Sequence, residues 1–386
     1  MTEDLLAYII ENDPTFTFLV GTNGSGKTQR LSGLANELLD AGRQVIAVAN
    51  TVFDRFPRSR NPRYGRVSHS NGQHYAIDVF KRAIISSGSE TFRNSMLIGK
   101  ALEYTGFNPV IGVHVRLWDS IDYERLYPSL ADSMPEHDVA AVMRAFDIYK
   151  NYSSERQSAW IDMFGESMIG PDRREILVLL KYESKLRQMK LLRSIAITIE
   201  KGRSAYDLGS ASSGELSLLA TYAYIATNIR DGTVILIDEP ENSLHPKWQW
   251  EYCKRLLDQF YLYSPKFVIA THSPHIVQGA QTAEVEVHLM KMNSGETTSA
   301  TSPKSIEGTL YEVFGVLSPS NHYLSEKVAF ILNEVVQDRQ TLPDAQAELA
   351  ELQRVSNDPE QRSFLLRAVE LAATVKSQVL SQTGEG

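Results

Sequence analysis

The residues whose type and spacing most directly suggest chemistry are the eight of Gly21–Thr28, which read GTNGSGKT. They fit the pattern GxxxxGK[ST] at every position, and this pattern predicts a loop that binds the phosphates of a nucleotide. Glycines let backbone N–H groups turn inward around a phosphate, and the following helix N-terminus adds partial positive charge. Lys27 would reach the β- and γ-phosphates, and the Thr28 hydroxyl would ligate Mg²⁺. The nucleotide-binding residues predicted in this phosphate loop are Asn23, Gly24, Ser25, Gly26, Lys27 and Thr28.

Two carboxylates end an apolar run much later in the chain. Residues 234–239 read VILIDE, the pattern of a buried strand that ends in Asp238 and Glu239. Strands of an α/β sheet deliver their carboxyl ends to the ligand crevice. Asp238 is therefore the predicted Mg²⁺ ligand opposite Thr28, and Glu239 is the predicted catalytic group that orients or deprotonates the attacking water. The structural alternative is a strand end capped by surface acids. It is less favoured because the same chain also contains the phosphate loop.

A serine- and glycine-rich stretch, ASSGEL at 211–216, precedes a helical pattern. Ser212 and Ser213 are both suitable helix N-caps, so a well-capped helix is the simpler interpretation. The alternative is an anion site, because free N–H groups at a helix start can donate hydrogen bonds to a γ-phosphate. In that alternative the nucleotide-binding set includes Ser212, Ser213, Gly214 and Glu215.

A histidine ends another apolar strand pattern, KFVIATHS at 266–273. A histidine at a strand end commonly has a structural role. Near a γ-phosphate, however, it could donate a hydrogen bond and sense whether the phosphate is present. His272 is therefore a candidate catalytic residue.

These residues need an α/β fold to bring them together. Strand patterns are expected at 15–22, 44–51, 109–117, 194–200, 234–238, 266–273 and 284–292, and helices at 27–40, 78–104, 215–230 and 246–260. The phosphate loop thus follows a strand and opens a helix, which a glycine-rich turn with an incidental lysine would not require. Residues 52–75 are expected to be irregular, and 120–190 mostly helical.

The chain changes character after about residue 318. Leu324, Val328, Ile331 and Val335 recur at helical spacing, as do Leu365, Val369 and Ala372. We therefore expect one ATPase-like domain over 1–318, with a helical insertion at about 78–190, and an all-helical C-terminal appendage over 319–386.

Composition excludes several classes of protein. The 386 residues are 42% hydrophobic and 22% charged, which is ordinary for a soluble globular protein. The net charge of −8 argues against a chain that simply coats nucleic acid, and the single cysteine, Cys253, excludes an internal disulfide framework. The N-terminus has no signal-peptide pattern, and no apolar run is long enough for a membrane helix. We expect a cytoplasmic protein without a membrane partner.

Four of these elements, in this order, resemble the ATP-binding-cassette (ABC) ATPases, and in particular their soluble branch of RecF, structural-maintenance-of-chromosomes (SMC) proteins and overcoming-lysogenisation-defect (OLD) AAA ATPases. Gly21–Thr28 resembles the Walker A motif, 234–239 resembles Walker B, and 212–215 resembles the signature motif. The run PENSLHP at 240–246 and ATHSPHIV at 270–277 are similar to the OLD-like forms. The resemblance covers about 15–53 and 190–292.

The resemblance implies a P-loop NTPase fold, ATP and Mg²⁺ as ligands, Glu239 as the catalytic glutamate and His272 as the switch histidine. It also implies a head-to-tail homodimer, or a higher homo-oligomer, in which Ser212 and Gly214 of one subunit act on the γ-phosphate held by the other. The chain departs from the family in its short N-terminal segment, in the weakness of its Q-loop candidate, Gln73, and in the absence of a toprim nuclease pattern after residue 318.

Five arginines, with Phe56 and Tyr64 among them, form a candidate nucleic-acid surface: Arg55, Arg58, Arg60, Arg63 and Arg66. Guanidinium groups with aromatic rings suit phosphate and base contact. The alternative is a solvated loop, or one that packs on the nucleotide domain.

We therefore expect an ATP-hydrolysing dimeric switch that controls a separate effector, a nuclease or toxin, in the manner of ATPase components of bacterial anti-phage systems. The alternative is a RecF- or SMC-like ATPase of DNA repair or chromosome maintenance that binds DNA directly. A transporter ATP-binding subunit and a non-hydrolysing scaffold are weaker alternatives, because the run after Glu239 is not transporter-like and Glu239 itself is present.

Overall fold

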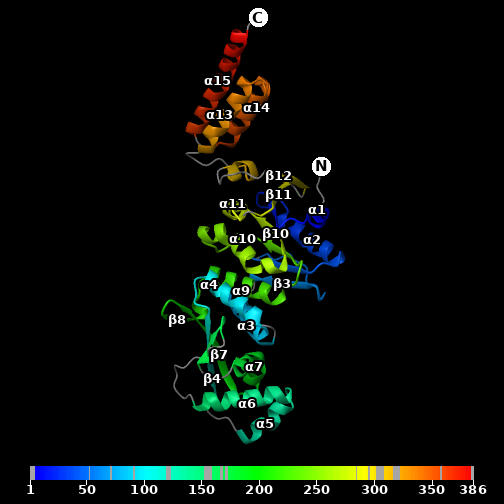
Figure 1. Ribbon diagram of the computed structural model, residues 1–386, viewed down its shortest axis with the longest axis vertical. Helices are drawn as coiled ribbons and strands as arrows, with labels where there is room; N and C mark the ends of the chain where they lie inside the picture. The colour runs from blue at the N-terminus through cyan, green and yellow to red at the C-terminus, as the bar shows by residue number, and fades with distance from the viewer. Residues whose placement is uncertain are drawn as a thin grey trace.

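The computed structural model describes residues 5–51, 53–69, 72–89, 92–118, 123–151, 159–165, 168–169, 173–283, 285–293, 296–300, 308–315, 322–356 and 359–383. The molecule is elongated (Figure 1). C-terminal helices form one end, a largely parallel sheet with its helices forms the middle, and helices from the first half of the chain form the other end.

A seven-stranded sheet in the order β12-β11-β1-β10-β9-β2-β3 lies at the centre. Its strands are β1 (Phe16–Val20), β2 (Val45–Ala49), β3 (Tyr64–Ser68), β9 (Val234–Asp238), β10 (Lys266–Thr271), β11 (Val287–Asn293) and β12 (Glu296–Ala300). Neighbouring strands run parallel, except that β11 and β12 pair antiparallel. The carboxyl ends of β1, β10, β9 and β2 therefore meet at one edge, as the α/β prediction requires.

The sheet is buried on both faces, which explains the continuous apolar runs in its strands. On one face, Leu19, Ala47 and Leu236 pack with side chains of α1 (Leu5–Asn12) and α2 (Lys27–Asp40). The other face carries Phe18, Ile46 and Ile237. These side chains share a core with three helices from the second half of the chain. These helices are α9 (Ser213–Asn228), α10 (Pro246–Phe260) and α11 (Pro274–Gln281).

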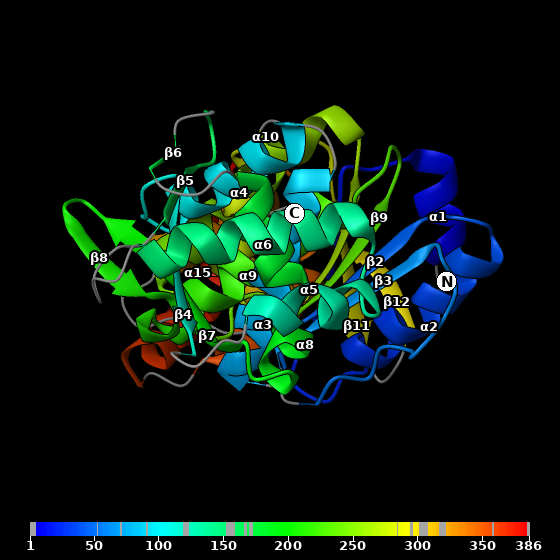
Figure 2. The ribbon, with the colours of Figure 1, turned by 90° about the horizontal axis from the view of Figure 1, so that it is seen from below.

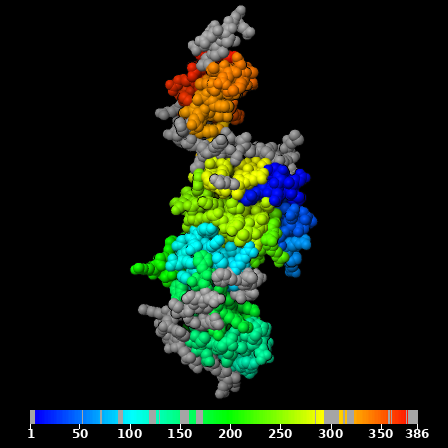
Figure 3. Space-filling view, viewed as in Figure 1, coloured from blue at the N-terminus to red at the C-terminus, as the bar shows by residue number. Residues whose placement is uncertain are grey.

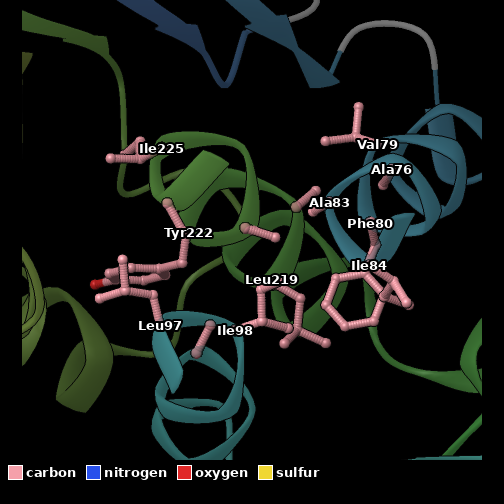
Figure 4. Close-up of a cluster of buried hydrophobic side chains, with 14 of the residues drawn as sticks. Ala76, Val79, Phe80, Ala83, Ile84, Leu97, Ile98, Leu219, Tyr222 and Ile225 are labelled. Carbon is pink, nitrogen blue, oxygen red and sulfur yellow. The ribbon is translucent and has the colours of Figure 1, made fainter. Parts of the chain in front are cut away.

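Helix α9 is the central support of that second face. Figure 4 shows its Leu219 and Tyr222 between α3 (Gly72–Ser89), which presents Phe80 and Ile84, and α4 (Phe92–Tyr104), which presents Leu97 and Ile98. All of these side chains are buried. The helix that begins with the serine-glycine stretch is thus fixed by apolar packing on more than one side.

A second, antiparallel sheet in the order β6-β5-β4-β7-β8 lies beside the first, and Figure 2 separates the two in a view from below. Its strands are β4 (Val110–Leu117), β5 (Ala159–Asp162), β6 (Met168–Ile169), β7 (Leu192–Lys201) and β8 (Ser204–Asp207). The accompanying helices are α5 (Tyr123–Ala131), α6 (Glu136–Asn151), α7 (Arg173–Lys181) and α8 (Glu183–Gln188).

Strand β4 confirms the strand expected at 109–117, but the expectation that the rest of the insertion at about 78–190 is helical is wrong in part, since β5 and β6 also lie within it. Strands β5 and β6 are too short to show a period-2 pattern against helical neighbours. Strand β5 pairs with β4, which is far away in sequence, and β6 pairs with β5. The expectation of irregular structure over 52–75 is also wrong in part. Strand β3 occupies Tyr64–Ser68, where a central Arg66 interrupts the apolar pattern, and α3 begins at Gly72.

Three helices follow the sheets: α13 (His322–Val336), α14 (Leu342–Val355) and α15 (Pro359–Thr383). They share a hydrophobic cluster of their own, which includes the predicted periodic residues Leu324, Val328, Ile331, Val335, Leu365 and Ala372. In the space-filling view they form an orange and red lobe beyond the rest of the molecule (Figure 3). The domain boundary at 318/319 stays a prediction, because 316–321 lie outside the described residues. Within the described ranges, no helix combines the length and apolar character needed to cross a membrane.

Candidate functional site: a phosphate loop at the edge of the parallel sheet

The phosphate loop Gly21–Thr28 connects β1 to α2, as predicted. Gly24 and Gly26 adopt φ angles of 82° and 96°, in the left-handed region where a side chain would be strained. A Cβ added to Gly21 would lie 2.7 Å from the carbonyl oxygen of Met292 and 2.9 Å from Ser25 Oγ, so the loop starts against the neighbouring strand. The glycines therefore serve both the turn and the close packing of the backbone.

Lys27 lies beneath the loop and is 5% exposed. Its Nζ donates to the carbonyl oxygens of Gly21 at 2.8 Å and Thr22 at 3.2 Å, and lies 4.0 Å from Glu239 Oε1. The Ser25 hydroxyl is buried without a hydrogen-bond partner among the described residues. A loop that encloses a cation and an unpaired hydroxyl suits an anionic ligand with several oxygens.

Asp238 and Thr28 meet as predicted. Thr28 Oγ1 lies 3.0 Å from each carboxylate oxygen of Asp238, and Asp238 is fully buried. Burial raises the pKa of Asp238 to about 7, and the negative charge of Glu239 adds to this rise, while the Thr28 hydroxyl and the Lys27 charge oppose it. A buried carboxylate beside a hydroxyl is a pair of hard oxygen ligands of the kind that Mg²⁺ prefers.

Glu239 and His272 lie on neighbouring strand ends, β9 and β10. His272 Nδ1 is 2.5 Å from Glu239 Oε2, so the two predicted catalytic side chains are in contact. Glu239 has a φ of 52°, which is uncommon for a residue with a side chain and turns the chain sharply out of the sheet. The turn places the Glu239 carboxylate, rather than its backbone, beside the phosphate loop.

Glu241 is a site residue that was not singled out from the sequence. It is 6% exposed, and its Oε1 accepts from Thr271 Oγ1 at 2.7 Å and from the His272 backbone N–H at 2.6 Å. The same oxygen lies 3.1 Å from His272 Nδ1. Burial raises the pKa of Glu241. The only sequence signal was a second acid two positions after Glu239, in the run shared with OLD-like ATPases.

These groups surround one cavity of about 550 Å³. Its described lining consists of Asn23, Gly24, Ser25, Gly26, Lys27, Thr28, Gln29, Thr51, Phe53, Arg55, Glu239, Asn242 and His272. All six predicted phosphate-loop residues and both predicted catalytic residues are thus gathered in one place. Thr51, Phe53 and Asn242 were not predicted, because their contribution depends on where the segments after β2 and β9 turn.

The serine-glycine stretch lies outside this lining. Ser212 is the N-cap of α9 and forms a capping box, in which its Oγ accepts from the Glu215 N–H at 3.3 Å and its own N–H donates to Glu215 Oε2 at 2.8 Å. Ser212 and Ser213 are exposed. Within one chain, then, the simpler interpretation of a capped helix describes the geometry, and the cap is not among the described lining residues of the cavity.

Backbone packing connects α9 to the segment after β9. Gly214 is buried, and a Cβ added there would lie 2.4 Å from the carbonyl oxygen of Ser243. Asn50, at the end of β2, accepts from Ser217 through Oδ1 at 3.3 Å and from Asn242 Nδ2 through its carbonyl at 3.2 Å. The start of α9 and the turn that follows Glu239 are therefore linked in the same subunit by short, direct contacts.

The Q-loop candidate is not at the cavity. Gln73 begins α3, and its side-chain amide donates to the carbonyl of Gly209, just before the serine-glycine stretch. Gln73 is not among the described lining residues.

The residues of the arginine-rich loop differ in their contacts and exposure. Arg66 forms an ion pair with Asp54, whose side chain is 3% exposed, and Phe56 is buried in the core. Tyr64 packs partly buried against the same core. Arg55, Arg58, Arg60 and Arg63 are exposed. The two aromatic rings thus stabilise the loop and are not available for base stacking, and Arg66 shares this structural role.

Comparison with known proteins finds similarity over parts of the chain. The family model described as "AAA domain, putative AbiEii toxin, Type IV TA system" matches residues 118–278. The Retron Ec83 probable ATPase of Escherichia coli is 28% identical over 134 residues, which is 32% of this chain and 23% of the relative. The Retron Vc95 probable ATPase of Vibrio cholerae serotype O1 biovar El Tor is 26% identical over 119 residues, or 28% of this chain and 23% of the relative. The matches therefore span about a quarter of each relative's length.

Solved structures of ATP-binding cassettes also match over much of the chain. A nucleotide-free cassette from an ABC transporter is 13% identical, with a TM-score of 0.29, over 77% of this chain and 84% of that one. The cbiO1 protein of Clostridium perfringens is 11% identical, with a TM-score of 0.29, over 74% and 75%.

The phosphate loop, its parallel sheet and the family match define an α/β P-loop protein that resembles the ABC-type ATPases. Among these, the curated relatives show that it resembles the ATPases of retrons.

Proposed function

We propose that this chain binds ATP and Mg²⁺ in the cavity and hydrolyses the bond to the γ-phosphate. The observation that carries the proposal is the convergence of Lys27, Thr28, Glu239 and His272, from two strand ends and one helix start, around a single cavity, with Asp238 in contact with Thr28. Phosphoryl transfer needs positioning and charge stabilisation more than covalent chemistry from the protein, and these residue types supply both.

The residues fit a magnesium ion on chemical grounds. The Thr28 hydroxyl and the Asp238 carboxylate would hold it, and their present mutual contact of 3.0 Å keeps both on the same side of the loop. When bound, Mg²⁺ would neutralise charge on the phosphate oxygens. The low solvent exposure of Asp238 keeps its carboxylate from being solvated instead by bulk water.

Each remaining side chain has a defined task in this proposal. Lys27 exchanges its loop carbonyl partners for phosphate oxygens. Glu239 orients the attacking water and accepts its proton, which requires the Glu239 carboxylate to leave its contact with His272. His272, held by Glu241 at its backbone and ring, is then free to donate a hydrogen bond to the γ-phosphate.

A second copy of the chain is supported by the position of the α9 cap. Ser212 and Ser213 are exposed and lie outside the cavity lining of their own subunit. We infer that the cap, with Ser212, Ser213, Gly214 and Glu215, completes the site of a partner copy, so that ATP holds two subunits together. ATP hydrolysis would then release the pair.

By analogy with the retron ATPases, we infer that this switch controls a separate effector, a nuclease or toxin, in anti-phage defence. The family description, which names a toxin and a toxin–antitoxin system, supports a setting of this kind. The alternative, a RecF- or SMC-like enzyme that binds DNA directly, is less well supported, because Arg66, Phe56 and Tyr64 are engaged within the protein. DNA binding that survives the joint change of Arg55, Arg58, Arg60 and Arg63 to alanine would locate any such contact elsewhere.

The direct test is Lys27→Ala. Removing the only cation beneath the phosphate loop among the described lining residues should abolish Mg-dependent release of phosphate from ATP, by at least about a hundredfold. Lys247→Ala, on the exposed start of α10, is the matched control and should retain full turnover. Full turnover by the Lys27 variant would remove the phosphate loop from the reaction.

A further inference from the structure

The cavity has an edge that the phosphate chemistry does not use. Phe53 is 81% exposed, the largest exposed fraction among the large apolar side chains of the described residues. It lies in the segment between β2 and β3 and lines the same cavity as the phosphate loop. A single exposed phenyl ring is common on protein surfaces. The informative feature of Phe53 is that its exposed ring lies at the edge of a ligand cavity.

The segment that follows this ring is held by several contacts. Asp54, next in sequence, accepts the Phe56 N–H at 2.9 Å and pairs with Arg66 through its other oxygen. The carbonyl of Arg55 accepts a hydrogen bond from Ser32 Oγ of α2 at 2.8 Å. Phe56 is anchored in the core. Phe53 is therefore joined directly to an anchored segment, at the edge of the cavity.

The composition of the lining shows what the ring could bind. Phe53 is the only phenyl ring among the described lining residues, and the others supply glycine backbone, amides, hydroxyls and charges. The phosphate loop accounts for the triphosphate of a nucleotide but offers nothing flat and apolar for its base. Aromatic rings stack on nucleobases, and an adjacent guanidinium such as that of Arg55 suits the same ligand.

We propose that Phe53 stacks on the nucleobase of the bound nucleoside triphosphate and that Arg55 lies beside it, so that the segment after β2 recognises the base. This inference rests on the proposed function, because it assumes that the phosphate loop holds the triphosphate. Stacking tolerates different bases but favours larger ring systems. Stacking on Phe53 therefore adds similar binding free energy for ATP and GTP, and less for CTP and UTP.

The test compares ATP with inorganic tripolyphosphate, which has the phosphates and no base. Equilibrium binding with Mg²⁺ is measured for the wild-type chain and for Phe53→Ala. We expect the substitution to weaken ATP binding about ten- to a hundredfold, the range for loss of one base–aromatic stack, and to leave tripolyphosphate binding unchanged. Equal effects on the two ligands, or no effect on ATP, would overturn the proposal.

A second variant reports the stack directly. Phe53→Trp should bind ATP as tightly as the wild type, and its added indole emission should be quenched by ATP but not by tripolyphosphate. Phe330→Trp, at a 57% exposed position on α13 outside the cavity lining, is the matched control and should not respond. Unquenched emission from the Phe53→Trp variant with ATP bound would place the base elsewhere.

The outcomes separate this inference from the function beneath it. Suppose that Lys27→Ala abolishes the binding of both ligands while Phe53→Ala alters the affinity for neither. The phosphate site is then supported and the nucleobase site is excluded. If neither ligand binds the wild-type chain, both proposals fail.

Discussion

Among single residues, Asp238 combines complete burial with the negative charge that the proposed Mg²⁺ site needs. Because burial raises its pKa from the ordinary 3.8 to about 7, the folded protein holds a proton that the unfolded chain releases between those values. Stability in the absence of metal should therefore fall as pH rises from about 4 to 7, and the full penalty, on the order of 4 kcal/mol, is present above pH 7. The charge that Asp238 needs for its proposed role in holding Mg²⁺ thus lowers the free energy of unfolding.

Asp238→Asn should remove this penalty. We expect urea unfolding at pH 8 without metal to give a higher free energy of unfolding for the variant, by a few kcal/mol, with the difference vanishing near pH 4. Mg-dependent ATP hydrolysis should be lost. Asp54→Asn is the control. It should lower the free energy of unfolding, because it leaves Arg66 without its ion-pair partner. If the Asp238→Asn variant were less stable than the wild type at pH 8, neighbouring groups would have to compensate the buried charge of Asp238 in the wild-type protein.

Glu241 is expected to act through His272 rather than on the nucleotide. It is absent from the described cavity lining, yet it binds the backbone and ring of the histidine that lines it. We expect Glu241→Ala to lower kcat about ten- to a hundredfold and to change ATP affinity less than twofold. Glu241→Gln, which keeps an acceptor oxygen for Thr271 and the His272 amide, should recover part of the rate.

A double-mutant cycle tests this positioning role. In the His272→Ala background, Glu241→Ala should have little additional effect on kcat, because its partner is already gone. Additive losses would mean that Glu241 acts independently of His272.

At the scale of elements, α9 and the segment after β9 pack so closely that glycine is required between them. A Cβ at Gly214 would lie 2.4 Å from a backbone oxygen, and Ser243, which supplies that oxygen, already has a φ of 65°. Movement of either element should therefore displace the other. This contact connects the cap that we assign to the partner's site with the turn that carries Glu239.

Gly214→Ala should force these two elements apart. We expect the melting temperature to fall by several degrees, consistent with about 1–3 kcal/mol of overpacking, and ATP turnover to fall at least tenfold while ATP still binds. Gly33→Ala in α2 is the matched control, since its Cβ would meet no atom nearer than 3.8 Å, and it should be neutral or slightly stabilising. Unchanged turnover in the Gly214 variant would show that the close contact does not couple the sites.

At the scale of the whole molecule, the prediction concerns two copies of the chain. Glu239→Gln should bind ATP without hydrolysing it, and sedimentation with Mg-ATP should show twice the mass of one chain. Adding Ser212→Arg, which places a long cation at the exposed α9 cap, should return the mass to that of one chain while leaving ATP binding intact. A Glu239 variant that stays monomeric with bound ATP would remove the dimeric switch.

The sequence by itself determined the parts that depend on local chemistry. The phosphate loop requires glycines at fixed positions, and a strand buried on both faces requires an apolar run, so Gly21–Thr28, β9, β10, α2 and α10 could be predicted closely. The periodic C-terminal helices followed from the same rules. Asp238, the predicted Mg²⁺ ligand, and Glu239, the predicted catalytic residue, could be singled out because both acids stand at the end of such a run.

The tertiary structure alone decided what depends on partners distant in sequence. Strand β5 exists because β4 offers hydrogen bonds, and β6 pairs in turn with β5. The antiparallel sheet that contains them could not be predicted from such short, mixed segments. Glu241 and Phe53 became site residues only when the turns after β9 and β2 brought them to His272 and the phosphate loop. Local sequence sets backbone preference within a few residues, but the direction in which a loop carries a side chain depends on packing against the whole sheet.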